Sequence, residues 1–233
     1  MNATAKNIIE NQKYDFVYSS PLAKCLDENE LEILMESGEV YMLEKHELLF
    51  QQGDISDKLF FLLDGVVKIA YSNFDGREMI KSILHPGAIF GEHCIAGEEI
   101  RDNYSSVMSS TASVMAVDKK VLLGMIQKNS GLSLCIINFF GKRLKDTEER
   151  LESLILQDAR ERIVEFIKLY ANAYGKQVGY ELLLKHSFTQ QDIANYTGVS
   201  RQTVTTVLNQ LKRSNKIHFR GKSMLIRNIA ALS

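Results

Sequence analysis

Residues 189–213 read TQQDIANYTGVSRQTVTTVLNQLKR, and they predict two short helices joined by a tight turn. Thr189 and Asp192 have the spacing of a capping box, which satisfies free backbone N–H groups at the start of a helix. After the Thr-Gly-Val-Ser turn, Ser200 is expected to cap a second helix over residues 201–212. That segment has an apolar face with helical spacing, formed by Val204, Val207, Leu208 and Leu211. Two short helices around such a turn describe a helix-turn-helix.

The start of the second helix carries polar side chains on the face that points outward. In a helix-turn-helix, residues at this place contact the edges of DNA bases. Arg201 suits guanine and Gln202 suits adenine, because each can form two hydrogen bonds to that base. Lys212 suits a phosphate, which fixes position without reading sequence. The residues expected to contact DNA are Thr189, Gln190, Ser200, Arg201, Gln202, Thr203, Thr205, Thr206, Lys212, Arg220 and Lys222.

The surroundings of this motif support a polyanion as its partner. Residues 217–219 and 224–226 flank Arg220-Gly221-Lys222, which predicts a β-hairpin wing with a basic tip. Residues 158–233 carry 12 Lys and Arg against 5 Asp and Glu, whereas residues 1–157 carry 16 against 24. A basic module on an acidic body favours double-stranded DNA as the partner of that module, over an ordinary solvated face.

Residues 41–117 follow a different pattern, with short strands separated by turns. Asp64-Gly65 lies between two apolar runs, 58–63 and 66–71, and predicts a hairpin because glycine accepts a positive φ. Asp75-Gly76 repeats this signal after the second run. Strands at this spacing predict an antiparallel, jelly-roll-like β-roll, whose interior can hold one small ligand.

A long helix is expected over residues 132–156, after a shorter helix that Asp118 caps. One of its faces is an apolar seam with a single polar member, formed by Ile137, Phe140, Leu144, Thr147, Leu151 and Leu154. A seam of this length needs a partner, and an identical chain is favoured over packing against the helix's own domain. Asp158 and Glu161 have the spacing of another capping box, so the long helix is expected to end near Gln157.

These elements predict an α+β chain in three parts. Residues 1–128 are expected to form a β-roll sensor domain with an N-terminal arm, and residues 129–157 a dimerisation helix. Residues 158–233 are expected to form a winged helix-turn-helix domain. No apolar run approaches the ~18 residues of a membrane span, and the N-terminus lacks the apolar core of a signal peptide. We therefore expect a cytoplasmic protein without membrane contact.

Catalytic and metal chemistry find little support in the sequence. Cys25, Cys94 and Cys135 form no CxxC pair, so we expect no metal site and three free thiols, buried and inert rather than redox-active. The sequence contains no supported pair of catalytic carboxylates, no phosphate-binding loop and no nucleophile elbow. We expect no catalytic residue and no resident cofactor, and the enzyme alternative is disfavoured.

In combination, these motifs resemble the Crp/Fnr family of bacterial regulators over nearly the whole chain. The β-roll region carries the family's series of glycines at Gly53, Gly65, Gly76, Gly87 and Gly91. Residues 60–65 (FFLLDG) and 87–92 (GAIFGE) resemble its cyclic-nucleotide-binding motifs, and residues 189–211 its helix-turn-helix signature. The resemblance implies a homodimer whose recognition helices enter successive major grooves of a palindromic site, with RNA polymerase as a further partner.

The residues that bind the family's ligand are matched less well in this sequence than the residues that define its fold. In members that sense cyclic AMP, a Gly-Glu pair is followed by Arg-Ser, which holds the phosphate. Gly91 and Glu92 match the first pair, but Asn103 and Tyr104 stand at the positions of the second, which removes the charge that a buried phosphate requires. Arg101 can substitute only if its loop shifts. On the long helix, Thr147 matches a threonine that contacts the adenine in the family, although Glu148 replaces the adjacent serine.

We therefore expect Gly91, Glu92, Asn103, Tyr104 and Thr147 to bind a small uncharged, aromatic or weakly acidic effector of unknown identity. Three alternatives stay open: a regulator that responds to cyclic nucleotides, one without a ligand that abundance controls, and a haem sensor. The possible haem ligands are His85, His93 and Cys94. The cysteine cluster of the family's iron–sulfur branch is missing. Thr206 replaces an arginine common in the family's recognition helix, so the usual DNA half-site is not assumed.

Overall fold

The computed structural model describes Leu22 and residues 25–232. The chain forms two compact units that divide within the long helix α4 (Ser130–Leu156), between Lys145 and Asp146, and the second unit also includes Glu78–Ile80. The expected N-terminal arm over residues 1–20 lies outside the described residues. Among the helices described, none combines the length and the apolar character needed to cross a bilayer.

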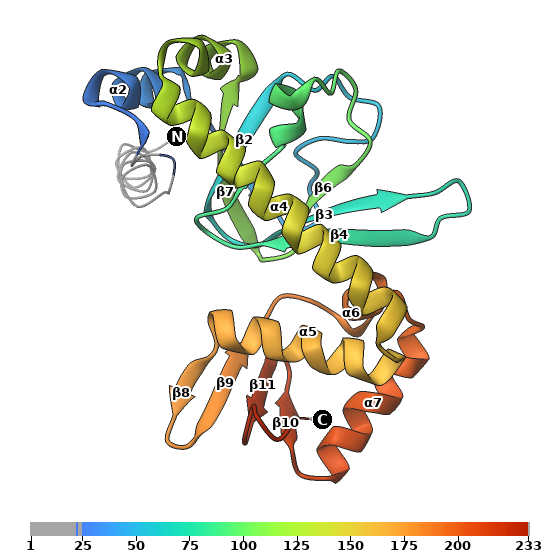
Figure 1. Cartoon of the computed structure of the whole chain (residues 1–233). Coiled ribbons are helices and arrows are strands. Elements are labelled where there is room, and N and C mark those ends of the chain that lie inside the picture. Colours follow the sequence, from blue (N-terminus) through green and yellow to red (C-terminus); the bar gives the residue numbers. More distant parts are fainter. Residues whose placement is uncertain (1–21, 23–24, 233) are drawn as a thin grey trace. The chain divides into compact units, whose positions relative to one another are not determined.

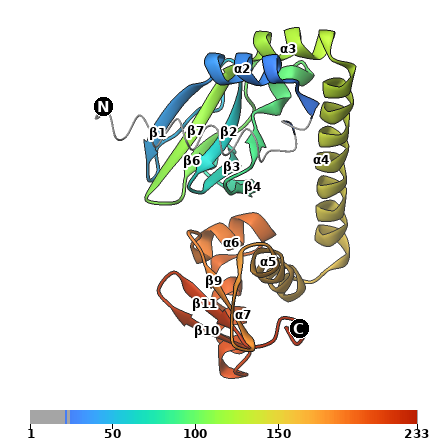
Figure 2. The same cartoon turned by 90° about the vertical axis from the view of Figure 1, so that its left-hand side faces the viewer.

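The N-terminal unit is a β-roll of two antiparallel sheets with helices at one end (Figures 1 and 2). One sheet has the order β1-β7-β2-β5 and the other β4-β3-β6. The strands are β1 (Glu39–Glu44), β2 (Lys58–Asp64), β3 (Val67–Ser72), β4 (Glu78–Leu84), β5 (Ile89–Phe90), β6 (Tyr104–Val107) and β7 (Thr111–Asp118). The helices are α2 (Glu28–Ser37), the short 3-10 helix η2 (Glu92–Ala96), α3 (Lys119–Lys128) and the start of α4.

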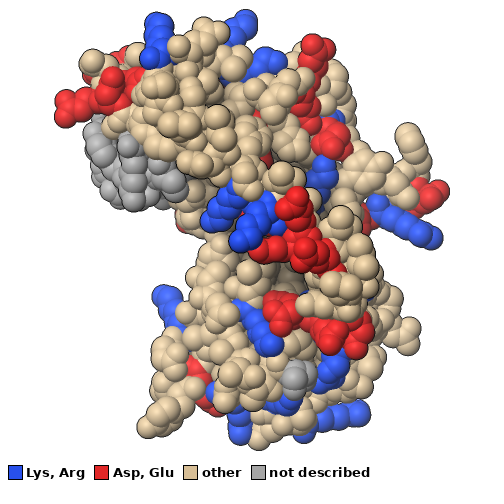
Figure 3. All heavy atoms as spheres, in the orientation of Figure 1, with Lys and Arg blue, Asp and Glu red and all other residues tan. Residues whose placement is uncertain are grey.

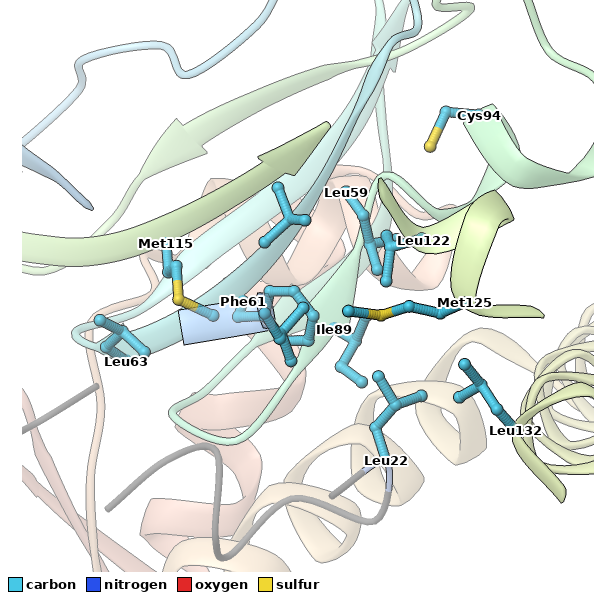
Figure 4. Packing of buried hydrophobic residues seen from close by; sticks show 12 residues of the cluster. Leu22, Leu59, Phe61, Leu63, Ile89, Cys94, Met115, Leu122, Met125 and Leu132 are labelled. Atoms are coloured by element: carbon cyan, nitrogen blue, oxygen red, sulfur yellow. The ribbon is translucent and has the colours of Figure 1, made fainter. Parts of the chain in front are cut away.

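Strand β2 lies at the centre of this unit because both of its faces are covered. Phe61 is fully buried on the face that packs against α2, α3 and α4, and Phe60 lies in the core on the other face. Figure 4 shows the first of these cores, a cluster that contains Phe61 and Met115 of the sheet, residues of α3 and Leu132 of α4. Strand β2 therefore has a continuous apolar run, whereas a strand with one solvated face would alternate apolar and polar residues.

One turn prediction is wrong and another is confirmed. Asp64-Gly65 does not close a hairpin, because β2 pairs with β7 and β5 whereas β3 belongs to the other sheet. Gly65 has a φ of +90°, so the chain does turn sharply there, but it passes from one sheet to the other. Asp75-Gly76 does join two neighbouring strands, β3 and β4.

The C-terminal unit contains three further helices and a four-stranded sheet with the order β10-β11-β9-β8. Its helices are α5 (Ala159–Tyr174), α6 (Gln190–Thr197) and α7 (Arg201–Arg213). Its strands are β8 (Lys176–Val178), β9 (Glu181–Lys185), β10 (Ile217–Arg220) and β11 (Ser223–Ile226). Phe166 of α5 is the aromatic centre of the core, with its ring centroid 5.0–5.1 Å from those of Tyr196 and Phe188.

The observed architecture confirms the expected α+β fold, with a β-roll, a long helix and a winged helix-turn-helix. Asp158 forms the predicted capping box with Glu161 at the start of α5. The division at residues 128 and 157 stays a prediction, since the compact units separate inside α4.

The expectation of three free cysteines is wrong. Cys25 and Cys135 form a disulfide across 110 residues of sequence, with their Cα atoms 6.5 Å apart. Cys94 is free and buried, as expected. The sequence does not reveal this pair, because only folding brings Cys135, near the start of α4, beside Cys25, which precedes α2.

Candidate functional site

The helix-turn-helix is built by local capping. Thr189 accepts a hydrogen bond from the backbone N–H of Asp192, whose carboxylate accepts from the backbone of Thr189. Ser200 Oγ accepts from the backbone N–H of Thr203 at 3.0 Å and so fixes the start of α7. The predicted apolar face of α7 is buried: Val204, Val207, Leu208 and Leu211. The buried face therefore fixes α7 on the core, and the opposite face of the helix points outward.

The candidate DNA-contacting residues differ in how much of their hydrogen bonding is already used. Thr205 Oγ1 donates to Gln190 Oε1 at 2.7 Å, and Thr206 Oγ1 contacts the carbonyl of Gln202 at 3.0 Å. Arg201 and Gln202 are exposed, and no hydrogen bond from their side chains to another described residue is present. Their donors point from the start of α7 into solvent, which is where base contacts are made in this motif.

Basic residues accompany this surface. Arg220 and Lys222 are exposed at the tip of the β10–β11 hairpin, and Lys212 is exposed near the end of α7. Figure 3 shows Lys and Arg side chains gathered on the C-terminal unit near its lower edge. Sequence reasoning missed the exposed Asn209, which lies seven residues after Gln202 and thus on the same face of α7. That spacing could have identified it.

A second candidate site surrounds Gly91 in the N-terminal unit. Gly91 has a φ of +75°, and a Cβ atom there would lie 2.8 Å from a ring carbon of Phe60, so only glycine fits without rearrangement. The chain then enters η2 with Glu92, which is only 8% exposed. A buried carboxylate requires a compensating partner.

That partner is Arg143 of α4, which sequence reasoning missed. Its Nε lies 3.4 Å from Glu92 Oε1, and another guanidinium nitrogen donates to the carbonyl of Ile89 at 3.0 Å. Arg143 lies one helical turn before Thr147. The family threonine quoted above could therefore have pointed to it.

The loop that holds Asn103 and Tyr104 supplies no cation at these positions. Asn103 is 8% exposed, and its amide donates to Asp102 Oδ1 at 2.6 Å. The other oxygen of Asp102 accepts from Lys81 Nζ at 2.9 Å. Tyr104 begins β6 and pairs with Ala70 of β3. Around Gly91 the structure thus brings together Glu92, Arg143 and Arg101, with Arg143 already paired to Glu92.

Arg101 is the other basic side chain of this loop, and its guanidinium borders Gly91, where a Cβ atom would lie 3.1 Å from it. It is 3% exposed, donates to the carbonyl of Lys58 at 2.6 Å and lies 4.2 Å from the ring centroid of Phe50. Removal from water lowers the pKa of this guanidinium. It borders a cavity of about 380 Å³ whose lining includes Tyr41 and Leu48. Arg101 is therefore held by contacts with Phe50 and Lys58.

Thr147 and the seam residues lie on α4. Ile137 is 64% exposed, Leu144 61% and Leu151 57%, so this apolar face is not packed against the described part of the same chain. Thr147 is exposed and lies on the part of α4 that belongs to the C-terminal unit. Its expected approach to Gly91 stays a prediction.

Whether His85, His93 and Cys94 hold a haem stays a prediction. In the described part of the chain, the group of His, Cys, Asp and Glu side chains with metal-site spacing consists of His93, Glu98 and Asp102. Its carboxylates are already engaged: Glu98 accepts from Ser56 at 2.6 Å, and Asp102 pairs with Lys81. Burial lowers the pKa of His85 to about 4, and burial raises the pKa of the Cys94 thiol to about 11.

Sequence comparisons identify two domains and several relatives. The family described as "Cyclic nucleotide-binding domain" matches residues 42–129, and the "Crp-like helix-turn-helix domain" matches residues 161–233. The "CRP-like cAMP-activated global transcriptional regulator" of Mycobacterium tuberculosis is 30% identical over 178 residues, which cover 76% of this chain and 79% of the relative. The "Global nitrogen regulator" of Synechocystis is 25% identical over 83% of this chain and 87% of its own length.

Solved structures show the same fold. FixK2 from Bradyrhizobium japonicum superimposes with a TM-score of 0.75 at 19% identity, covering 84% of this chain and 95% of that one. The c-di-GMP-responsive regulator CLP from Xanthomonas campestris gives 0.72 at 21% identity, covering 87% and 100%. Two of these names give different signal molecules, cAMP and c-di-GMP, so the names do not define one common effector.

Proposed function

The chain belongs to the Crp/Fnr family of transcription regulators, and from this premise we propose that it is a homodimeric, sequence-specific DNA-binding regulator gated by a small effector other than cyclic AMP. We further propose that it acts in the cytoplasm, on palindromic double-stranded DNA and together with RNA polymerase. The observation that carries the DNA-reading part is the exposed start of α7. Arg201 and Gln202 keep their donors there, while neighbouring threonine hydroxyls bond within the motif.

The homodimer is supported by the exposed seam of α4. Exposed leucine and isoleucine side chains recur there over several helical turns, and burying them against an identical helix would remove apolar surface from water on both copies. A two-fold dimer presents two copies of α7, which matches a palindromic site with half-sites about one DNA turn apart. Sedimentation velocity on the chain alone tests the dimer, and a monomer at micromolar concentration refutes it.

The effector is argued from charge around Gly91. A buried phosphate needs an uncompensated cation. Three cations lie near this site: Arg143 and Lys81 already contact Glu92 and Asp102, and the guanidinium of Arg101 borders Gly91, where a Cβ atom would lie 3.1 Å from it. Arg101 is held by Phe50 and Lys58. An uncharged, aromatic or weakly acidic ligand meets less electrostatic opposition here than a cyclic phosphate does.

Calorimetry with cyclic AMP tests this reasoning. We expect no binding at physiological concentrations. The relatives named as cyclic-AMP-activated favour the opposite outcome, and a micromolar dissociation constant would establish that alternative. Native mass spectrometry of protein purified from its own cells distinguishes a bound effector from a regulator without a ligand.

A further inference from the structure

We propose that Cys25 and Cys135 form a reversible redox pair whose oxidation strengthens dimerisation through α4. The redox pair is argued from the structure of the N-terminal unit. The expected effect of its oxidation on DNA binding rests on the proposed function. The pair belongs to the N-terminal unit, and neither cysteine is among the candidate effector-binding or DNA-contacting residues.

Backbone geometry allows the bond to form and to break without rearrangement of the fold. The Cα atoms of Cys25 and Cys135 are 6.5 Å apart. That separation lies inside the range of about 4.4–6.8 Å at which two cysteines can be bridged. Cys25 immediately precedes the segment that caps α2, and Cys135 lies in the second turn of α4. The two elements already face one another.

Contacts other than the disulfide hold this junction together. The side-chain amide of Asn129 donates to the carbonyl of Cys25 at 3.0 Å and to Glu30 at 2.7 Å. Its oxygen accepts from the backbone N–H of Leu132 at 3.0 Å, in the first turn of α4. Because Asn129 connects both partners, reduction leaves the two thiols close together. Such proximity gives a high effective concentration for re-forming the bond.

The bond ties the inner face of α4 while leaving its outer face available. Leu132, Ile136 and Phe139 lie on the inner face and pack into the core beneath α2 and α3. Cys135 has the helical spacing of this inner face, whereas Ile137, on the seam, is 64% exposed. A covalent tie at Cys135 restrains the start of the helix against its own unit. A restrained seam loses less conformational freedom when it pairs with a second copy.

The chemistry balances with a small disulfide as the oxidant, for example oxidised glutathione. The thiolate of one cysteine attacks a glutathione sulfur, forms a mixed disulfide and releases one glutathione thiol. The second cysteine thiolate then attacks the protein sulfur and displaces the other glutathione. The protein loses two protons and two electrons, and two glutathione thiols carry them away. Cys25 and Cys135 are only half-buried, so a small thiol or disulfide can reach them.

Cys94 serves as an internal reference. It is 3% exposed, and burial raises the pKa of its thiol to about 11, so little thiolate is present at neutral pH. It lies in the core against which Cys25 packs. Oxidation should therefore change two cysteines and leave the third as a thiol.

The first experiment counts thiols in the full chain. The protein is equilibrated in buffers that run from reduced to oxidised glutathione, then unfolded, alkylated with N-ethylmaleimide and weighed by mass spectrometry. We expect three alkylations per chain in reduced glutathione and one in oxidised glutathione, with full return on reversal. Cys94→Ser should show two alkylations in reduced glutathione and none in oxidised glutathione. If the natural chain shows three alkylations in every buffer, or one in every buffer, the two cysteines do not form a reversible redox pair.

The second experiment measures dimerisation and DNA affinity of the reduced and oxidised forms. We expect oxidation to lower the dimer dissociation constant several-fold and to tighten DNA binding in parallel, both in the natural chain and in Cys94→Ser. Cys25→Ser and Cys135→Ser should lose this response. Equal dimerisation in the two redox forms overturns the regulatory claim. Failure of both forms to bind DNA, with redox-dependent dimerisation intact, refutes the proposed function instead.

Discussion

Replacing Leu151 with glutamate places a charge in the proposed seam and should separate the dimer. Leu151 is 57% exposed in the single chain, so more than half of its surface is left for a partner to cover. Full burial of a leucine contributes about 1.5–3 kcal/mol, so covering this remainder on both copies contributes about 2–3 kcal/mol. Its loss alone weakens dimerisation by roughly 30- to 150-fold. Two facing carboxylates add repulsion and a desolvation cost.

Sedimentation equilibrium on Leu151→Glu measures this change, with DNA binding as the second readout. Leu169→Glu is the matched control, because Leu169 of α5 is 55% exposed and lies off the seam. We expect a monomer with weak DNA binding for the seam variant and an unchanged dimer for the control. A seam variant that stays dimeric at the dissociation constant of the natural chain shows that α4 does not pair along this face.

Three further outcomes test the DNA surface and the N-terminal unit. Arg201→Ala should cost about 1–3 kcal/mol per half-site and relax specificity at one base pair, whereas Lys212→Ala should weaken all sequences alike and flatten the salt dependence; equal losses on specific and random DNA for Arg201→Ala exclude base reading. Gly91→Ala should destabilise the fold by about 1–3 kcal/mol in urea unfolding, because it adds a steric clash to a positive φ. Gly97→Ala, at a φ of +99° with no atom within 4 Å of the added Cβ, should cost less, and equal costs show that the clash does not matter. Burial lowers the pKa of His85 to about 4, so the unfolded chain binds a proton more readily and the free energy of unfolding should fall as pH drops from about 6.5 towards 4. His85→Gln should flatten that fall in denaturant titrations, and an unaltered pH profile removes His85 as its cause.

Local capping explains why the helix-turn-helix could be predicted closely from the sequence. The second helix is expected over 201–212 and is observed at Arg201–Arg213. Ser200 fixes its start through one side-chain contact to the backbone, and such a contact depends only on neighbouring residues. The same holds for the capping box of Asp158 at the start of α5.

Long-range packing decides the features that the sequence did not reveal. Asp64-Gly65 produces a turn, but whether the flanking strands pair depends on β7, which comes almost fifty residues later and pairs with β2. The disulfide between Cys25 and Cys135 depends on a contact across 110 residues. Arg143 contacts Glu92, which comes about fifty residues earlier in the sequence. Neither periodicity nor local spacing carries information about such contacts.

The two faces of α4 offer a route from the proposed effector site to the proposed dimer seam. Arg143 lies on the inner face and contacts Glu92 and the carbonyl of Ile89, beside the candidate effector site. Leu144, the next residue, is 61% exposed on the seam. An effector that competes for Glu92 or Arg143 would therefore act on the helix residue next to Leu144, a member of the proposed seam. Because a ligand shifts an equilibrium only by its differential affinity for the two states, contact with Arg143 must differ between the two pairings of α4. Arg143→Lys should then reduce the effect of an effector on dimerisation more than it reduces dimerisation itself, and sedimentation with and without the effector measures the difference.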